Sequence, residues 1–160
     1  MPEYLAALVV VALVGAGLVS GLLFAFSNFV MRALRELPPE SGMQAMQRIN
    51  VTVLNPGFLA LFVGTTVVCL AIVALCMLRL ESPGAAWLLA GASAYLLGPF
   101  GVTALANVPL NERLAGRGPS EAATEWPRYV TAWLRWNHVR TLAGAVSVAL
   151  LAIGLWASGR

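Results

Sequence analysis

Four long stretches of this 160-residue chain contain no charged side chain, and they constrain its fold more than any other feature. They cover residues 4–31, 51–78, 82–111 and 141–159. Each can supply the roughly 20 apolar residues that cross about 30 Å of hydrocarbon as a helix, which satisfies its own backbone hydrogen bonds. Only 11% of the residues are charged, whereas soluble domains carry about 25%. We therefore predict an integral membrane protein.

The expected fold is an all-α, integral membrane four-helix bundle that forms one transmembrane domain over residues 1–160. The spans are expected at about residues 4–31, 53–79, 85–108 and 139–157. The first span is expected to be a retained helix, because its leader "MPE" lacks the basic residues of a signal peptide. Pro83 and Gly84 indicate a short turn, which would make spans two and three antiparallel neighbours. Pro109 is expected to end span three, since proline biases the preceding residue away from helix.

The two long connections are expected to be partly helical. In the first, Ser41 and Gln44 fit a capping box that starts a helix. Four residues fall along one stripe of this helix: Met43, Met46, Asn50 and Val53. We therefore expect an amphipathic helix at the membrane surface. In the second connection, Thr124 can cap a helix that continues unbroken from Arg128, as a helical extension before span four.

Arginine supplies every basic side chain, and its distribution predicts an orientation in the membrane. Residues 32–50 carry three arginines and residues 112–140 carry five, whereas the opposite side carries only Arg79 and Arg160. The positive-inside rule places both long loops in the cytoplasm and both termini outside. High alanine and arginine without lysine is typical of a GC-rich bacterial genome, so we expect the bacterial inner (plasma) membrane. The net charge of +3 is spread over the loops, which indicates topology and not nucleic-acid binding.

The asparagines of the chain predict a polar pocket. There are six: Asn28, Asn50, Asn55, Asn107, Asn111 and Asn137. All fall near one face of the membrane in the predicted topology, one or two for each span. Asparagine also caps helices and joins them by hydrogen bonds, which explains each position but not their gathering on one side. Polar residues at membrane depth are candidates for a functional site.

The segment "WLRWNHVRT", residues 133–141, supplies the richest chemistry. Six residues recur at intervals of three and four, which predicts one helix face: Trp126, Tyr129, Trp133, Trp136, Asn137 and Arg140. Trp126 and Tyr129 also fit an interfacial aromatic belt. Trp133 and Trp136 favour stacking of a planar aromatic ligand. Arg140 could then pair with an anionic oxygen of that ligand, or with a lipid headgroup.

Two residues are candidates for a general base. His138 is the one histidine, and histidine is the side chain best suited to exchange protons near neutral pH. It could equally be a structural hydrogen-bonding group. Glu112 is the carboxylate nearest the polar cluster, and it is either an alternative base or a solvated charge.

Several classes of site are not indicated. The chain has no GxSxG, P-loop or HExxH motif and no aspartate, and its single histidine argues against a metal or haem site. We expect no metal ligand and no cofactor. Cys69 and Cys76 lie seven residues apart in one span, a rise of roughly 10 Å that is too long for a disulfide. They are expected to be small core residues.

In these motifs the chain resembles the anthrone oxygenase family, also called the DUF1772 family. The resemblance rests on Asn50, on Asn55-Pro56, on "TALANVPLN" (residues 103–111) and on "WLRWNHVRT", in that order on four hydrophobic spans. It covers about residues 15–155. Fungal members oxidise polyketide anthrones to anthraquinones with molecular oxygen, without a recognised metal or flavin. The matching positions are Asn50, Asn107, Pro109, Asn111, Trp136, Asn137 and Arg140.

The resemblance implies a membrane-embedded, cofactor-independent oxygenase that oxidises a lipophilic, anthrone-like aromatic substrate with O2. An anthrone is planar and weakly acidic, so its oxidation requires a base and donors to the developing oxyanion. We expect His138, Arg140 and Asn137 to be catalytic. The residues expected to bind substrate are Asn50, Asn55, Thr103, Asn107, Asn111, Trp133 and Trp136.

Two other functions remain open from the sequence. One is a non-enzymatic membrane protein that binds a quinone, a lipid or a partner subunit. The other is a transporter, although the inverted repeats common in transporters are not evident. The partners expected in every case are the lipid bilayer and a hydrophobic small molecule. The sequence leaves open whether the chain forms a homo-oligomer.

Overall fold

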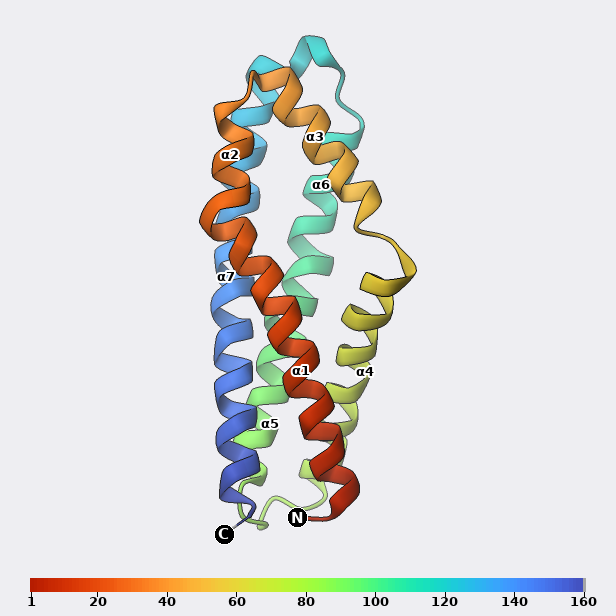
Figure 1. Cartoon of the computed structure of the whole chain (residues 1–160), viewed down its shortest axis with the longest axis vertical. Coiled ribbons are helices and arrows are strands. Elements are labelled where there is room, and N and C mark those ends of the chain that lie inside the picture. Colours follow the sequence, from red (N-terminus) through yellow and green to blue (C-terminus); the bar gives the residue numbers. More distant parts are fainter. Residues whose placement is uncertain (160) are drawn as a thin grey trace.

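The computed structural model describes residues 1–159 as four helical columns arranged side by side in a long bundle (Figure 1). The first column comprises α1 (Glu3–Ala25), the π-helix η1 (Phe26–Val30) and α2 (Met31–Glu36), and the second comprises α3 (Pro39–Thr52) and α4 (Pro56–Met77). The third comprises α5 (Ala85–Tyr95), the π-helix η2 (Leu96–Asn107) and α6 (Val108–Ala115), and the fourth comprises the short η3 (Pro119–Glu121) and α7 (Ala122–Ala157). We call the end where α1 begins and α7 ends the terminal end, and the opposite end the loop end.

The predicted four-helix membrane bundle is confirmed. Within the part of the chain that the structure describes, four helical stretches are long and apolar enough to span a membrane: Glu3–Glu36, Pro56–Met77, Ala85–Ala115 and Pro119–Ala157. Three of them exceed the predicted spans, because the helices continue beyond the hydrocarbon. The 36 residues of α7 measure about 54 Å along the axis, against about 30 Å of hydrocarbon.

The prediction that Pro109 ends the third span is wrong. Pro109 occupies the first turn of α6, and the helix continues to Ala115. Proline is tolerated in the first turn of a helix, where a missing N–H breaks no regular hydrogen bond. The preceding π-helix η2 ends at Asn107, so α6 restarts the helical pattern just before the proline.

The predicted helix starts in the two long connections are also wrong, although the helices themselves exist. The helix α3 begins at Pro39 rather than at Ser41, and no side chain caps it. Proline in the first turn has a backbone already suited to helix. The long helix α7 begins at Ala122, two residues before Thr124, and follows η3 directly. It then continues to Ala157, so the helical extension before the last span is confirmed.

The helix α3 is amphipathic, but its apolar stripe faces the protein and not a membrane surface. Met43 and Met46 are buried in a cluster with Met31, Trp126 and Tyr129. The helix packs against α7. Burying each methionine contributes roughly 1.5–3 kcal/mol, which favours this packing over an exposed stripe. The loop half of the bundle therefore has a core of its own, here called the loop core.

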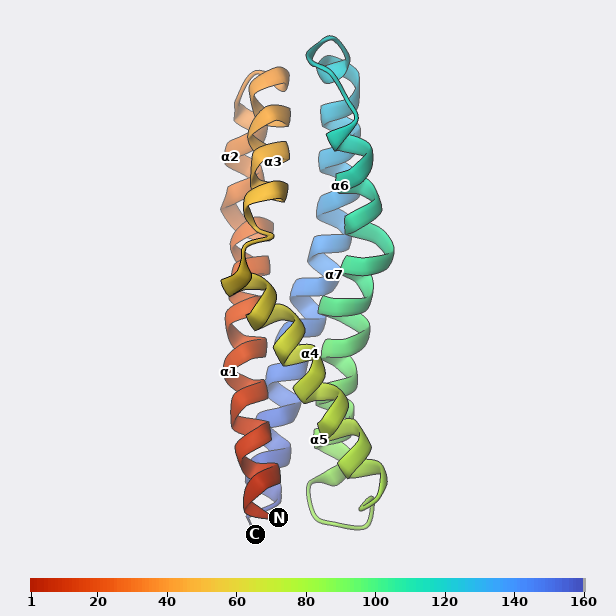
Figure 2. The same cartoon turned by 90° about the vertical axis from the view of Figure 1, so that its right-hand side faces the viewer.

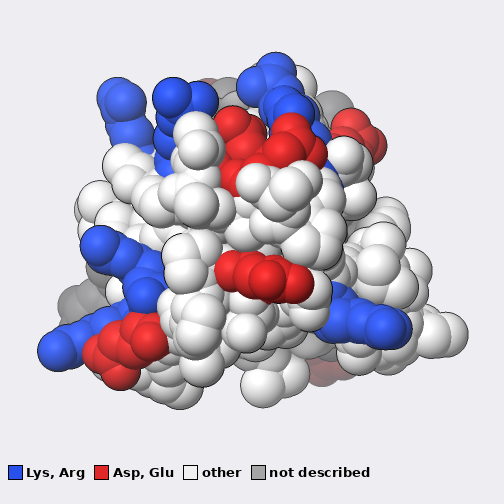
Figure 3. Space-filling model, turned by 90° about the horizontal axis from the view of Figure 1, so that it is seen from above, with Lys and Arg blue, Asp and Glu red and all other residues white. Residues whose placement is uncertain are grey.

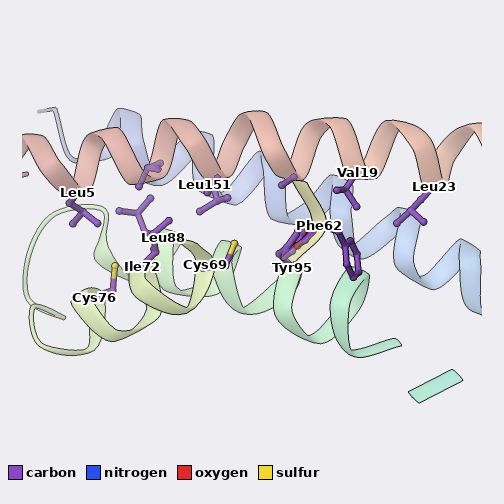
Figure 4. Close-up of a cluster of buried hydrophobic side chains, with 14 residues drawn as sticks. Leu5, Val19, Leu23, Phe62, Cys69, Ile72, Cys76, Leu88, Tyr95 and Leu151 are labelled. Carbon is purple, nitrogen blue, oxygen red and sulfur yellow. The ribbon is translucent and has the colours of Figure 1, made fainter. Parts of the chain in front are cut away.

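The terminal half is packed around a second core, here called the terminal core (Figure 4). Phe62 of α4 and Tyr95 of α5 belong to this core, and their ring centroids lie 6.4 Å apart. Small residues let the backbones approach closely: Gly144 of α7 faces Ser20 of α1. The charged side chains, by contrast, gather at the loop end, which is seen from above in Figure 3.

Candidate functional site

A cavity of about 540 Å³ lies between the two cores. Its size is within the range of roughly 300–1,000 Å³ that is typical of small-molecule sites. Most of its wall is apolar and aromatic. The polar residues of the wall are Gln47, Asn50, Thr103, Asn107, Asn111, Glu112 and Arg140. A second cavity, of about 240 Å³ at the terminal end, includes Arg79 and Ser158 but none of these residues.

The two π-helices place polar groups on both sides of α7. A π-helix is wider than an α-helix, and short π segments are frequent at functional sites. Pro99 lies inside η2 and has no N–H to donate, and the hydroxyl of Thr103 donates to its carbonyl oxygen. Thr103 then faces α7 from η2, and Ser27 faces it from η1.

Arg140 of α7 is a buried cation held only by uncharged groups. Its Nη1 donates to Thr103 Oγ1 at 2.9 Å, and its Nη2 donates to Asn137 Oδ1 at 2.7 Å. Its guanidinium carbon lies 5.1 Å from the centre of the Trp133 ring, a cation–π contact. The side chain is 5% exposed, and no carboxylate of residues 1–159 forms an ion pair with it. A buried ion costs several kcal/mol when it is unpaired, so Arg140 is suited to receive an anionic ligand atom.

Asn137 lies behind Arg140 and fixes its position. Its amide Nδ2 donates to Leu23 O and to Ser27 Oγ, both at 2.8 Å, while its Oδ1 accepts from Arg140. Ser27 Oγ also lies 3.0 Å from Thr141 Oγ1. One fully buried amide thus ties the first column to the arginine at the cavity.

A second set of hydrogen bonds fixes Trp133. Asn111 Oδ1 accepts from Trp133 Nε1 at 3.0 Å and from Tyr129 Oη at 2.8 Å. The indole ring also packs against Phe26, with centroids 5.5 Å apart. The cavity therefore presents a rigid aromatic face directly beside a cation.

Unsatisfied polar atoms concentrate at this cavity. Among the described residues, five buried side-chain nitrogen or oxygen atoms have no hydrogen-bond partner. Three belong to the cavity wall: Asn50 Nδ2, Asn107 Oδ1 and Arg140 Nε. Buried polar groups are nearly always paired in native proteins.

A comparison with known protein families gives a match for this chain. The model of the family described as anthrone oxygenase matches residues 57–150, which is more than half of the chain. The chain belongs to the anthrone oxygenase family. The matched region contains Thr103, Asn107, Asn111, Trp133 and Arg140, whereas Asn50 lies outside it. No curated protein and no solved structure matches the chain.

The structure brings together most of the candidate residues of this anthrone oxygenase family member. Six of them line the cavity: Asn50, Thr103, Asn107, Asn111, Trp133 and Arg140. Asn137 contacts Arg140 from behind. Glu112 also lines the cavity and is exposed at its edge.

Three other candidates lie away from the cavity wall. Asn55 is exposed and caps α4, where its Oδ1 accepts from Phe58 N at 3.0 Å. Trp136 is 40% exposed on the outer surface of α7. His138 is exposed as well, and its Nδ1 lies 3.0 Å from Ser27 Oγ, on the far side of Asn137 from the cavity.

Sequence reasoning missed Ser27 and Gln47. Ser27 lies between two phenylalanines in the first span, and a hydroxyl at membrane depth was the available signal. Gln47 gave no such signal, because its role depends on packing between α3 and α6. Cys69 and Cys76 are buried free thiols in the terminal core. Among the described residues, no group of three or more His, Cys, Asp or Glu side chains could hold a metal ion.

Proposed function

We propose that the protein is a membrane-embedded oxygenase that oxidises a lipophilic, planar aromatic substrate of the anthrone type with O2. One observation carries the proposal: a buried arginine, which has no carboxylate partner among residues 1–159, borders an aromatic-walled cavity. An anthrone becomes an aromatic oxyanion when its methylene group loses a proton. Arg140 and Asn50 are donors that could stabilise this oxyanion, the largest contribution in many enzymes of this kind. Membership of the anthrone oxygenase family supports the same chemistry.

The reaction balances with the substrate and O2 alone. The carbanion form of the substrate transfers one electron to O2, and the resulting radical and superoxide combine to form a carbon–oxygen bond. The hydroperoxide then loses water as the remaining C–H proton leaves and the O–O bond breaks. The methylene becomes a carbonyl, one oxygen atom stays in the product, and the other leaves as water. All four electrons that reduce O2 come from the methylene carbon.

We assign the first proton transfer to Glu112. This carboxylate lines the cavity and is exposed at its edge, so it can take a proton from the ligand and return it to solvent. His138 lies on the other side of Asn137 and reaches the site only through hydrogen bonds of Ser27. A role for His138 as the base would require its side chain to move.

Membranes containing the protein test this proposal directly. They are supplied with anthrone in air, and anthraquinone formation is followed against boiled membranes, since anthrones also oxidise unaided. The native protein should exceed this background. Glu112→Gln should lower the rate by about 10²–10⁴-fold, the usual contribution of a general base. His138→Gln should retain it, as should Glu36→Gln, which removes an exposed carboxylate paired with Arg32. A native rate equal to that of boiled membranes would refute the proposed reaction.

A second candidate is a carrier that binds a quinone without converting it. Asn50 and Arg140 of the cavity wall carry N–H donors, which would suit the carbonyl oxygens of a quinone. A carrier needs no base, so Glu112→Gln should then leave ligand binding unchanged. Purified protein that contains a quinone by mass spectrometry, without turnover of anthrone, would favour this second candidate.

A further inference from the structure

We propose that the cavity opens sideways into the bilayer and takes its ligand, a planar aromatic molecule dissolved in lipid, through this opening. The opening, here called the portal, is the exposed apolar part of the cavity wall: Val51, Leu54, Ala104 and Val108. Val51 is 73% exposed although it lines the cavity. The proposal rests on the binding role proposed above for the cavity.

A break in the second column leaves this side of the cavity uncovered by helix. The column is not helical at residues 53–55, between the end of α3 and the start of α4. Figure 2 shows α4 crossing the bundle obliquely below this break. Val51 lies on the last turn of α3 and Leu54 lies within the break, whereas Ala104 lies on η2 and Val108 on α6. The side walls of the portal therefore come from different columns.

The depth of the portal follows from the aromatic side chains on the surface. Trp136 and Trp156 are both exposed on α7 and lie twenty residues apart, which corresponds to about 30 Å of helix, the thickness of the hydrocarbon. Trp87 and Tyr4 are exposed at the same end as Trp156, as in an interfacial belt. Arg140 lies one turn inside Trp136. The cavity and its portal thus lie just within the hydrocarbon, toward the loop end.

Hydrogen bonds close the route from the cavity to water at the loop end. Gln47 of α3 lines the cavity, and its Nε2 donates to Leu114 O at 2.8 Å and to Arg117 O at 3.1 Å. These bonds join α3 to the end of α6. Above them, the methionine and tryptophan side chains of the loop core fill the space between the columns.

The polar atoms inside the cavity select the occupant. A lipid acyl chain could pass the portal, but it carries no polar atom for Asn50, Thr103 or Arg140 of the cavity wall. A planar aromatic molecule with oxygen substituents offers acceptors to the Asn50 amide and the Arg140 guanidinium, and it also packs against Trp133. Because such a molecule is concentrated in lipid, lateral access avoids its transfer through water.

Photolabelling in lipid vesicles tests the portal without requiring turnover. A small aryl diazirine dissolves in the bilayer, and glutathione in the aqueous phase consumes any reagent in water. Labels are located by mass spectrometry. Val19 and Phe62, which are buried but line the cavity, should be labelled together with the exposed Leu142.

Two adjacent variants provide the decisive comparison. Ala104→Trp fills the portal and should lower labelling of Val19 and Phe62 severalfold relative to Leu142. Leu105→Trp should not, because Leu105 is 84% exposed and lies outside the cavity wall. Labelling of Leu142 in every variant shows that the last span is inserted in the bilayer.

Other outcomes would overturn the proposal. Cavity labelling that Ala104→Trp leaves unchanged would exclude this portal. Labelling that glutathione abolishes, or that Gln47→Ala increases, would place the route on the aqueous side. Since the readout is labelling, a failure of anthrone oxidation in the turnover assay would leave the portal result standing, and the two failures are distinguishable.

Discussion

At the scale of single residues, the charge of Arg140 can be cancelled without removing the arginine. Thr103 accepts a hydrogen bond from its Nη1, and an aspartate there would place a carboxylate beside the guanidinium. We expect Thr103→Asp to weaken binding of 9-anthracenecarboxylate, a planar anion, by roughly 10- to 100-fold, since hydrogen bonds to charged groups are worth about 1.5–3 kcal/mol. Thr103→Asn keeps an acceptor without the charge and should bind nearly as well as the native protein. The measurement is equilibrium titration in detergent micelles, followed by probe fluorescence.

The aspartate variant separates two roles of Arg140. If Arg140 only joins helices, an ion pair with the introduced aspartate would preserve that function, and both variants should bind the anion equally. Equal affinity of the aspartate and asparagine variants would therefore contradict an anion-binding role. A loss in both would show that the threonine itself is required.

Helix periodicity alone predicted which segment of the last helix forms the site, but not which of its residues face the cavity. Counting from Trp133, a turn of 3.6 residues falls between Trp136 and Asn137. The sequence could not decide which of the two faces inward. Packing against α1 decides it, because Asn137 bonds Leu23 O and Trp136 is left on the outer surface. His138 is a further step around the helix and lies outside the cavity for the same reason.

At the scale of helices, the contact of α1 with α7 depends on the absence of a side chain at Gly144. A methyl group there would collide with Ser20 Oγ, so we expect Gly144→Ala to destabilise the protein by about 1–3 kcal/mol. Gly21 of α1 has open space around its Cβ position, and Gly21→Ala should be neutral or stabilising by roughly 0.5–1 kcal/mol. Thermal unfolding in detergent measures both. An unchanged midpoint for Gly144→Ala would mean that α1 and α7 can separate at no cost.

The helices could be predicted from the sequence more readily than their irregular turns. Long apolar stretches predicted four helices because lipid leaves few alternatives for the backbone. The π segments η1 and η2 left no periodicity to detect. Pro109 suggested a helix end, yet the proline inside a wide turn is Pro99, and the helix adapts to it. These turns set the positions of Ser27 and Thr103, so the contacts of Arg140 could not be derived from spacing.

At the scale of the whole molecule, hydropathy located the membrane helices but underestimated how far they extend beyond the apolar spans. The sequence predicted that residues 32–50 and 112–135 are only partly helical, whereas in the structure most of their arginines and glutamates lie on the outer surfaces of α2, α3, α6 and α7. Inward-facing methionines and tryptophans of the same segments form the loop core. Charge marks where a helix leaves the hydrocarbon, and it does not mark where the helix ends.

We propose that the loop end lies in the cytoplasm and the terminal end outside, in the inner membrane of a bacterium. Arginine at the loop end is exposed on helices α2, α3, α6 and α7, whereas Arg79 is the arginine of the turn between α4 and α5. Juxtamembrane arginines resist translocation, which is the basis of the positive-inside rule. Alkaline phosphatase joined after residue 160 should therefore be active, and green fluorescent protein at the same place should be dark. Insertion of the same reporters at Gly118, in the exposed loop before η3, should give the reverse pattern. Fluorescence from the fusion at residue 160 would show that the orientation is the opposite of the one proposed. Glu112 would then exchange its proton with the opposite compartment.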